Sequence, residues 1–121
     1  MKTAVCCIAK YENRYIREFV EYYLRLGFDN ILIYDNNDID GEKFEDVISD
    51  YIESGVVIMH NVRGISNKNF YDLLKTVYNN SYWRYFEEYD WIMYVDVDEF
   101  LFIDNNLGIK EYLSQDKFNN F

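Results

Sequence analysis

Short apolar runs alternate with longer amphipathic segments along this chain. Apolar and β-branched side chains fill residues 3–9, 30–34, 56–59 and 91–95, and runs of this length predict buried strands. Between consecutive runs, apolar residues recur at helical spacing, which predicts three helices. The apolar positions are Ile16, Phe19, Val20 and Tyr23 in the first, Phe44, Val47, Ile48, Tyr51 and Ile52 in the second, and Phe70, Leu73, Leu74, Val77 and Tyr78 in the third.

This alternation predicts an α/β fold with a mostly parallel sheet in three α/β/α layers, because strands that are apolar on both faces need helices on both sides. The chain has no proline and no low-complexity linker, so we expect a single domain over residues 1–121. Gly27 and Gly55 stand where the first two helices should end. The aromatic run 82–89 either continues the third helix with a bend or forms a second short helix, and another short helix is expected at 109–113.

In a parallel sheet of this kind, ligands bind outside the carboxyl ends of the strands. That rule directs attention to four loops, at residues 10–14, 35–41, 60–68 and 96–100. The net charge of −10, with 12 Lys and Arg against 22 Asp and Glu, argues against a nucleic-acid partner. An anionic ligand would therefore need help from a cation.

Targeting and redox features point to the cytoplasm. The apolar run at the N-terminus stops at Lys10, so we interpret it as a strand and not as a signal peptide. No window approaches the roughly 18 apolar residues of a transmembrane helix. Cys6 and Cys7 are the only cysteines, and neighbours on a strand point to opposite faces, so two reduced thiols are expected.

The fourth apolar run leads directly into Asp96-Val97-Asp98-Glu99. In an extended strand, Asp96 and Asp98 would point to the same side about 7 Å apart, where their repulsion would cost roughly 2 kcal/mol. A divalent cation would reverse that cost, and hard carboxylate oxygens suit Mg²⁺ or Mn²⁺. The alternative is a solvated acidic loop, and the apolar strand before it favours the metal site.

The loop after the second strand offers a different candidate. The carboxylate of Asp35 could accept hydrogen bonds from a base or a ribose, or Asp35 could simply form a turn, and these alternatives are nearly balanced. Residues 36–41 resemble the start of a calcium-binding loop, but Asn36 stands at its first position and Val47 at its twelfth, so calcium is disfavoured. His60, the only histidine, is interpreted as structural.

Known phosphate-binding motifs are missing from the sequence, which has no Gly-x-Gly-x-x-Gly, no Walker loop and no Gly-x-Ser-x-Gly elbow. A metal at Asp98, aided by one positive side chain, is the remaining means of holding phosphate. The candidates for that side chain are Lys10, Arg14, Arg63 and Lys68, although for each of the four taken singly a plain surface charge is the favoured interpretation.

Three segments together resemble the GT-A glycosyltransferases, most closely the bacterial family-2-like and family-92-like members. They are residues 9–38 (AKYENRYIREFVEYYLRLGFDNILIYDNND), 69–80 (NFYDLLKTVYNN) and 89–101 (YDWIMYVDVDEFL). The resemblance implies the Rossmann-like nucleotide-diphospho-sugar transferase (GT-A) fold. It also implies a DxD motif, in which Asp98 is the principal metal ligand and Asp96 reaches the metal or the ribose. Lys10 and Glu12 of the Lys-x-Glu turn, together with Asp35, would border the nucleotide sugar.

The resemblance covers only the donor half of the family's domain, so the chain is expected to be truncated and its general base is unassigned. Asn67 and Lys68 stand where the family often has Gln, and that contact is also unassigned. The implied function is metal-dependent transfer of a sugar from a nucleotide-diphosphate donor, foremost a UDP-sugar, to a glycan or lipid-linked acceptor. The setting would be bacterial polysaccharide or lipopolysaccharide assembly, in the cytoplasm or peripherally at the inner face of the membrane.

Two alternatives come from other functional classes. A truncated donor half could be a non-catalytic module that binds a nucleotide sugar or a partner subunit. A metal-dependent phosphohydrolase of the Asp-x-Asp type is disfavoured, because its nucleophilic Asp would end the first strand, where Lys10 and Tyr11 stand.

Overall fold

Four parallel strands form one sheet in the computed structural model, which describes residues 1–65 and 70–119. The strands are β1 (Thr3–Ala9), β2 (Asn30–Asp35), β3 (Val57–Asn61) and β4 (Trp91–Tyr94). Their order across the sheet is β3-β2-β1-β4, and every neighbouring pair is parallel. The predicted α/β class is confirmed.

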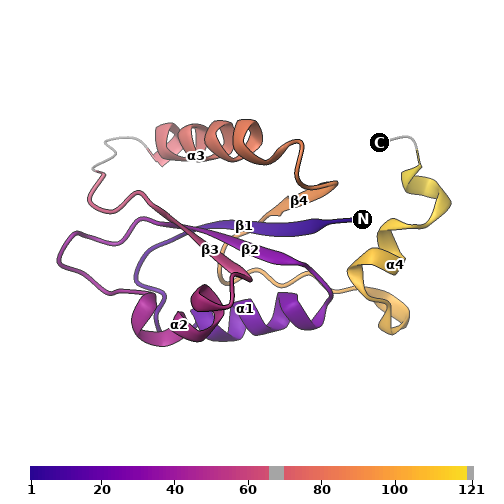
Figure 1. Cartoon of the computed structure of the whole chain (residues 1–121), viewed down its shortest axis with the longest axis horizontal. Helices are drawn as coiled ribbons and strands as arrows, with labels where there is room; N and C mark the ends of the chain where they lie inside the picture. Colours follow the sequence, from indigo (N-terminus) through magenta and orange to yellow (C-terminus); the bar gives the residue numbers. More distant parts are fainter. Residues whose placement is uncertain (66–69, 120–121) are drawn as a thin grey trace.

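Helices cover both faces of the sheet (Figure 1). They are α1 (Ile16–Arg25), α2 (Glu45–Glu53), α3 (Phe70–Tyr85) and the short α4 (Ile109–Leu113). Figure 1 shows α1 and α2 on one face, α3 on the other, and α4 beyond the end of the sheet where the chain begins. The three-layer α/β/α arrangement is therefore as predicted. No helix in the described ranges is both long and apolar enough to cross a bilayer.

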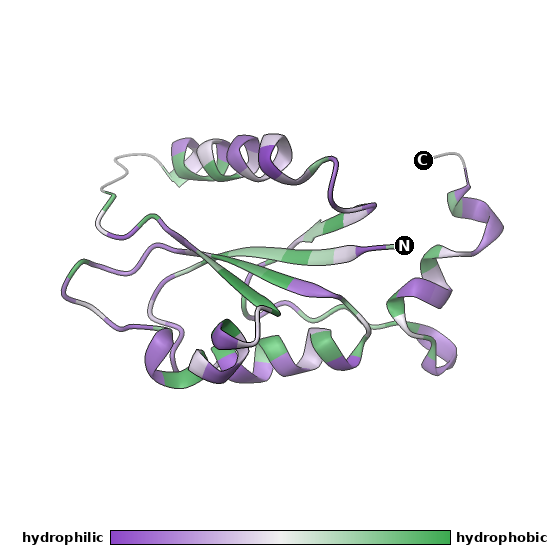
Figure 2. Ribbon diagram, viewed as in Figure 1, coloured by the Kyte–Doolittle hydropathy of each residue, from purple (hydrophilic) through white to green (hydrophobic). Residues whose placement is uncertain are grey.

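The core has two parts, one on each face of the sheet. Alternate residues of β1 belong to different parts of the core. Val5 and Cys7 pack towards α1 and α2, whereas Ala4 and Cys6 pack towards α3. The two adjacent cysteines thus lie on opposite faces and are free, as the period of two along a strand predicts. Apolar residues concentrate in the strands and on the inner faces of the helices (Figure 2).

Several boundaries differ from the predicted ones. The third helix continues without interruption to Tyr85, so the start of the aromatic run belongs to this helix and does not form a second one. The helix continues because it keeps a buried stripe at intervals of four residues, formed by Leu73, Val77, Ser81 and Tyr85. Strand β3 extends to Asn61 and so includes His60. Gly27 adopts a φ of 105°, a left-handed conformation that ends α1 as expected.

The geometry predicted for the acidic motif is wrong. Strand β4 ends at Tyr94, and the chain turns immediately afterwards, with the Glu99 amide donating to the Asp96 carbonyl at 3.0 Å. The Glu99 carboxylate in return accepts from the Asp96 amide at 2.7 Å. Val97 is buried within this turn and anchors it. Asp96 and Asp98 therefore flank a buried residue in a turn and do not line one face of a strand.

The two outer strands are less covered than predicted. Most side chains of β3 and β4 are only half-buried, whereas nearly all of those of β1 and β2 are buried. The apolar pattern of an outer strand resembles that of a central one, although its position at the edge of the sheet leaves it partly uncovered.

Candidate functional site

The strand order creates a switch point between β1 and β4. The chain moves from β1 to β2 and β3 on one side, then crosses back to place β4 on the other side of β1. Ligands of open α/β sheets bind at the carboxyl ends of the strands at such a point. Here the segments that leave those ends are Lys10–Glu12 after β1 and Asp96–Asp98 after β4.

Carboxylates gather at this switch point and act on one another. Partial desolvation raises the pKa of Glu12, and the charges of Asp98 and Glu42 raise it further. Desolvation also raises the pKa of Asp96, together with the charges of Glu99 and Asp98. Within residues 1–65 and 70–119, no salt bridge neutralises Glu12, Asp96 or Asp98. The site carries unbalanced negative charge that a cation would offset.

The donor chemistry fits a hard divalent cation. Carboxylate oxygens are what Mg²⁺ and Mn²⁺ prefer, and Mg²⁺ is commonly held by one or two carboxylates plus water and substrate phosphates. The described part of the chain contains no preformed group of three or more His, Cys, Asp or Glu that could hold a metal. A site built from Asp96 and Asp98 and completed by phosphate oxygens does not require such a group.

Asp35 has a different environment at the end of β2. Its Oδ2 lies 2.9 Å from Nη1 of Arg63, in an ion pair that is largely buried. Its Oδ1 accepts hydrogen bonds from the backbone amide and the side-chain amide of Asn37, at 2.9 and 2.8 Å. Both oxygens of Asp35 are therefore engaged within the protein.

The contacts continue from Asn37 to the end of β1. Asn37 is fully buried, and its Oδ1 accepts the backbone N–H of Tyr11 at 2.8 Å. Tyr11 has a φ of 59°, a left-handed conformation that costs a residue with a side chain roughly 1 kcal/mol or more. The hydrogen bond to Asn37 helps to hold that conformation. We call the four connected residues Arg63, Asp35, Asn37 and Tyr11 the strand-end network.

Arg63 also shapes the loop that follows β2. Its guanidinium donates to the backbone carbonyls of Asp38 at 2.7 Å and Glu42 at 2.8 Å, with longer contacts to those of Ile39 and Gly41. One side chain from the loop after β3 thus holds the loop after β2, which itself braces the turn after β1. The network connects three of the four strand ends.

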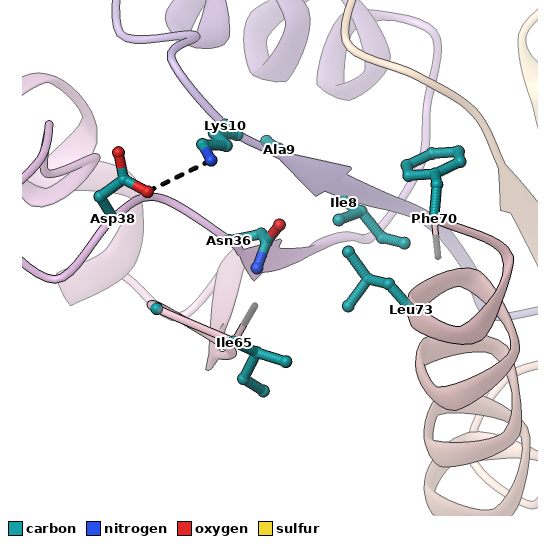
Figure 3. A pocket seen from close by; sticks show the side chains of 9 residues that line it. Ile8, Ala9, Lys10, Asn36, Asp38, Ile65, Phe70 and Leu73 are labelled. Atoms are coloured by element: carbon teal, nitrogen blue, oxygen red, sulfur yellow. Dashed lines mark ion pairs between the residues drawn. The ribbon is translucent and has the colours of Figure 1, made fainter. Parts of the chain in front are cut away.

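A cavity of about 490 Å³ opens beside this network. Figure 3 shows Lys10, Asn36 and Asp38 towards one side of it and Ile8, Phe70 and Leu73 towards the other. Lys10 Nζ lies 3.2 Å from Asp38 Oδ1, and the Tyr11 hydroxyl also donates to Asp38. A polar wall facing an apolar wall suits a ligand that combines a ring system with hydroxyl or phosphate groups.

The structure brings together part of the predicted site. Glu12 follows β1, Asp96 and Asp98 follow β4, the charge of Asp98 acts on both Glu12 and Asp96, and Lys10 lines the cavity. Asp35 lies nearby but is enclosed by its partners, one of which is Arg63, a candidate for holding phosphate. Asn67 and Lys68 lie outside the described residues.

The candidate Arg14 and the histidine interpreted as structural lie elsewhere. Arg14 is exposed, with its guanidinium 5.4 Å from the Tyr15 ring centroid. His60 is half-buried and stacks on Tyr34 with ring centroids 4.4 Å apart.

Sequence reasoning missed three residues of this region. Asn37 occurs in a run of turn-forming residues, so the pattern indicated a turn but not a buried brace. Tyr11 carries no local signal for a left-handed backbone. Phe70 matched the apolar stripe of α3 but is exposed at the cavity mouth.

Comparison with known proteins identifies the family of this chain. The family model described as Glycosyltransferase family 92 matches residues 2–120. A glycosyltransferase family 92 protein of rice, Oryza sativa subsp. japonica, is 27% identical over 112 residues, which cover 90% of this chain and 18% of the rice protein. This chain thus spans about a fifth of the curated relative it matches. No solved structure matches the chain significantly. With nearly its whole length matched by the family model, this chain belongs to glycosyltransferase family 92.

Proposed function

We propose that this chain forms the donor-binding part of a metal-dependent glycosyltransferase of the GT-A type. It would bind a nucleotide-diphosphate sugar, foremost a UDP-sugar, for transfer to a glycan or lipid-linked acceptor. Assembly of bacterial surface polysaccharide or lipopolysaccharide is the setting we expect, on the cytoplasmic side. The family match supports glycosyl transfer in general, and the donor, acceptor and metal belong to the proposal.

The observation that carries the proposal is that Glu12 follows β1 while Asp96 and Asp98 follow β4, the two strands of the switch point, without a neutralising cation among the described side chains. In a chain of net charge −10, an anionic diphosphate would be repelled from this edge. Asp96 and Asp98 would hold Mn²⁺ or Mg²⁺ there. When bound, the ion supplies positive charge that offsets the charge developing on the leaving diphosphate.

The adjacent cavity supports a position for the nucleoside. Its apolar wall, which includes Ile8 and Phe70, would contact the base, and Lys10 and Asp38 would face the ribose or the diphosphate. Asp35 would act by holding Asn37 and Arg63 in place, because its own oxygens already have partners.

Calorimetry with Mn²⁺ and uridine diphosphate tests this proposal. Wild-type protein should bind the nucleotide only when the metal is present. Asp98→Ala should weaken that binding more than about 100-fold, since loss of an outer partner of a metal ligand alone costs about 10- to 100-fold. Glu53→Ala, which removes an exposed carboxylate at the end of α2, is the matched control and should bind normally. Equal binding by Asp98→Ala and wild type would refute the metal site.

The non-catalytic alternative can be separated by product formation. A panel of nucleotide sugars should release nucleotide in the presence of an acceptor if the chain is active. Saturable donor binding with no product above background would identify a binding module instead.

A further inference from the structure

A second, smaller cavity lies between α3 and the outer strand β3. Its volume is about 160 Å³, and the two cavities share no lining residue within 1–65 and 70–119. On α3 the polar lining comes from Thr76, Asn80 and Arg84, which recur at intervals of four and so share one face of the helix. The opposite wall includes Tyr34 and His60, near the carboxyl ends of β2 and β3.

The polar groups of this cavity are mainly hydrogen-bond donors. The Oδ1 of Asn80 accepts a hydrogen bond from the Tyr34 hydroxyl at 2.7 Å, which leaves the two N–H groups of the amide as donors. Arg84, which is exposed, contributes a guanidinium that carries donors and no acceptor and lies 5.8 Å from the centroid of the Tyr85 ring. The imidazole of His60 contacts the Tyr85 hydroxyl through Nε2 at 2.5 Å, so its other ring nitrogen remains for a further contact.

The cavity is also positively charged within an acidic protein. The described residues that line it include no Asp or Glu, although the chain has 22 of them. Among the residues that the structure describes, Arg84 has no carboxylate within salt-bridge distance. The nearby Glu88 pairs instead with Lys2 at 3.0 Å. Burial lowers the pKa of His60, and the charge of Arg84 lowers it further, so the field of the guanidinium reaches the imidazole.

We propose that this cavity is an anion site that binds a phosphate or sulfate group, with Arg84 as the charged ligand and the Asn80 amide as a second donor. Guanidinium and amide donors match the oxygens of a tetrahedral oxyanion. The volume equals that of about five liquid-water molecules, which leaves room for the group and a small substituent. The proposal is independent of the donor site.

Nuclear magnetic resonance of the single histidine provides a direct test, because His60 is the only source of imidazole signals. Sodium sulfate is titrated at neutral pH, with sodium chloride added to keep the ionic strength constant. The His60 ring resonances should shift and saturate in the wild type. In Arg84→Gln the affinity should fall at least about tenfold, as expected for a lost charge-assisted hydrogen bond. A shift without saturation in the wild type would overturn the proposal.

Three further variants exclude indirect effects. Asn80→Asp keeps the acceptor for Tyr34 but replaces the two donors with a negative charge, so it should fold and lose sulfate binding. Arg84→Lys keeps the charge and should bind more weakly than wild type but more tightly than Arg84→Gln. Lys75→Gln removes an exposed charge from the same helix and should bind normally. If Lys75→Gln and Arg84→Gln weakened sulfate binding equally, the loss would come from the change in net charge alone, and the site would be refuted.

Two ligand arms identify the anion and its relation to the nucleotide. If glucose 1-phosphate binds more tightly than sulfate, the ligand is an esterified phosphate. If the two bind equally, the ligand is a free oxyanion. Both outcomes support the site. Uridine diphosphate with Mn²⁺ should bind Arg84→Gln as it binds wild type. Loss of both sulfate and nucleotide binding in that variant would assign the cavity to the nucleotide site and contradict a separate one.

Discussion

Two aspartate environments at the same edge of the sheet have opposite electrostatic character. Asp35, the last residue of β2, is buried, paired with Arg63 and accepts two hydrogen bonds from Asn37. Asp96 and Asp98, after β4, share their turn with Glu99, the charge of Asp98 acts on Glu12 and Asp96, and neither aspartate has an ion pair among the described residues. All three stand just after an apolar run, so residue type and position alone do not separate them.

The difference separates a structural role from a binding role. A buried carboxylate whose hydrogen bonds are all satisfied has little capacity left for a ligand, whereas carboxylates that repel one another gain most from a cation. Raised carboxylate pKa values in a cleft are a recognised sign of a functional site. We therefore expect changes at Asp35 to affect mainly stability and changes at Asp96 and Asp98 to affect mainly binding.

The largest effect on stability should come from Arg63→Ala. This change leaves the buried Asp35 carboxylate without its cation, and breaking a buried pair in this way costs about 3–5 kcal/mol. Urea denaturation would measure the loss. The matched control is Arg17→Ala, which breaks the exposed ion pair with Asp50 and should cost much less stability, because solvent screens an exposed pair. Equal losses in the two variants would show that the strand-end network does not stabilise the fold.

A smaller loss is expected for Asn37→Ala. The substitution leaves the Tyr11 amide and one oxygen of Asp35 short of a partner, which should cost about 1–3 kcal/mol. Because Tyr11 then loses a contact that holds its left-handed backbone, manganese-dependent nucleotide affinity should fall as well. Urea denaturation and calorimetry would measure the two effects. Asn119→Ala, at an exposed position, is the control and should keep the wild-type stability. If Asn37→Ala were as stable as this control, the bracing role of Asn37 would be contradicted.

The smallest effect on stability, with the opposite sign, is expected for Asp96→Asn without metal. The pKa of Asp96 is raised in the fold, so its contribution to stability is present at acidic pH and is lost as the pH rises through that pKa. Removing the charge should raise the melting temperature at neutral pH by about 2 °C, in line with roughly 0.5 kcal/mol for a surface change. The two proteins should converge below about pH 4.

Metal addition completes that experiment. Saturating Mn²⁺ with uridine diphosphate should stabilise wild type by about 2.7 kcal/mol at 100 times the dissociation constant, and Asp96→Asn much less. Glu53→Gln should follow the wild-type melting curve at every pH. If Asp96→Asn melted below wild type at neutral pH, Asp96 would stabilise the fold. That result would contradict the contrast between a structural Asp35 and a binding Asp96.

The secondary structure could be predicted well because it depends on local periodicity. The four strands, the three main helices and the left-handed Gly27 follow from residues within one element and its flanks. The observed ends of an element differ from the predicted ones where a neighbouring strand extends the pairing. Strand β3 continues to Asn61 because that residue pairs with Asp35 of β2. The turn that starts at Asp96 was missed because it depends on burial of Val97 against the core.

The sequence by itself determined the order of strands and helices, the surplus of negative charge and the residues that follow each strand, because these are properties of short segments. The tertiary structure decided what each of those residues does. Arg63 lies 28 positions from Asp35, and Asn37 lies 26 from Tyr11, and only the folded sheet brings them together. The role of a carboxylate depends on whether a partner arrives from a distant segment, and that contact is formed by folding.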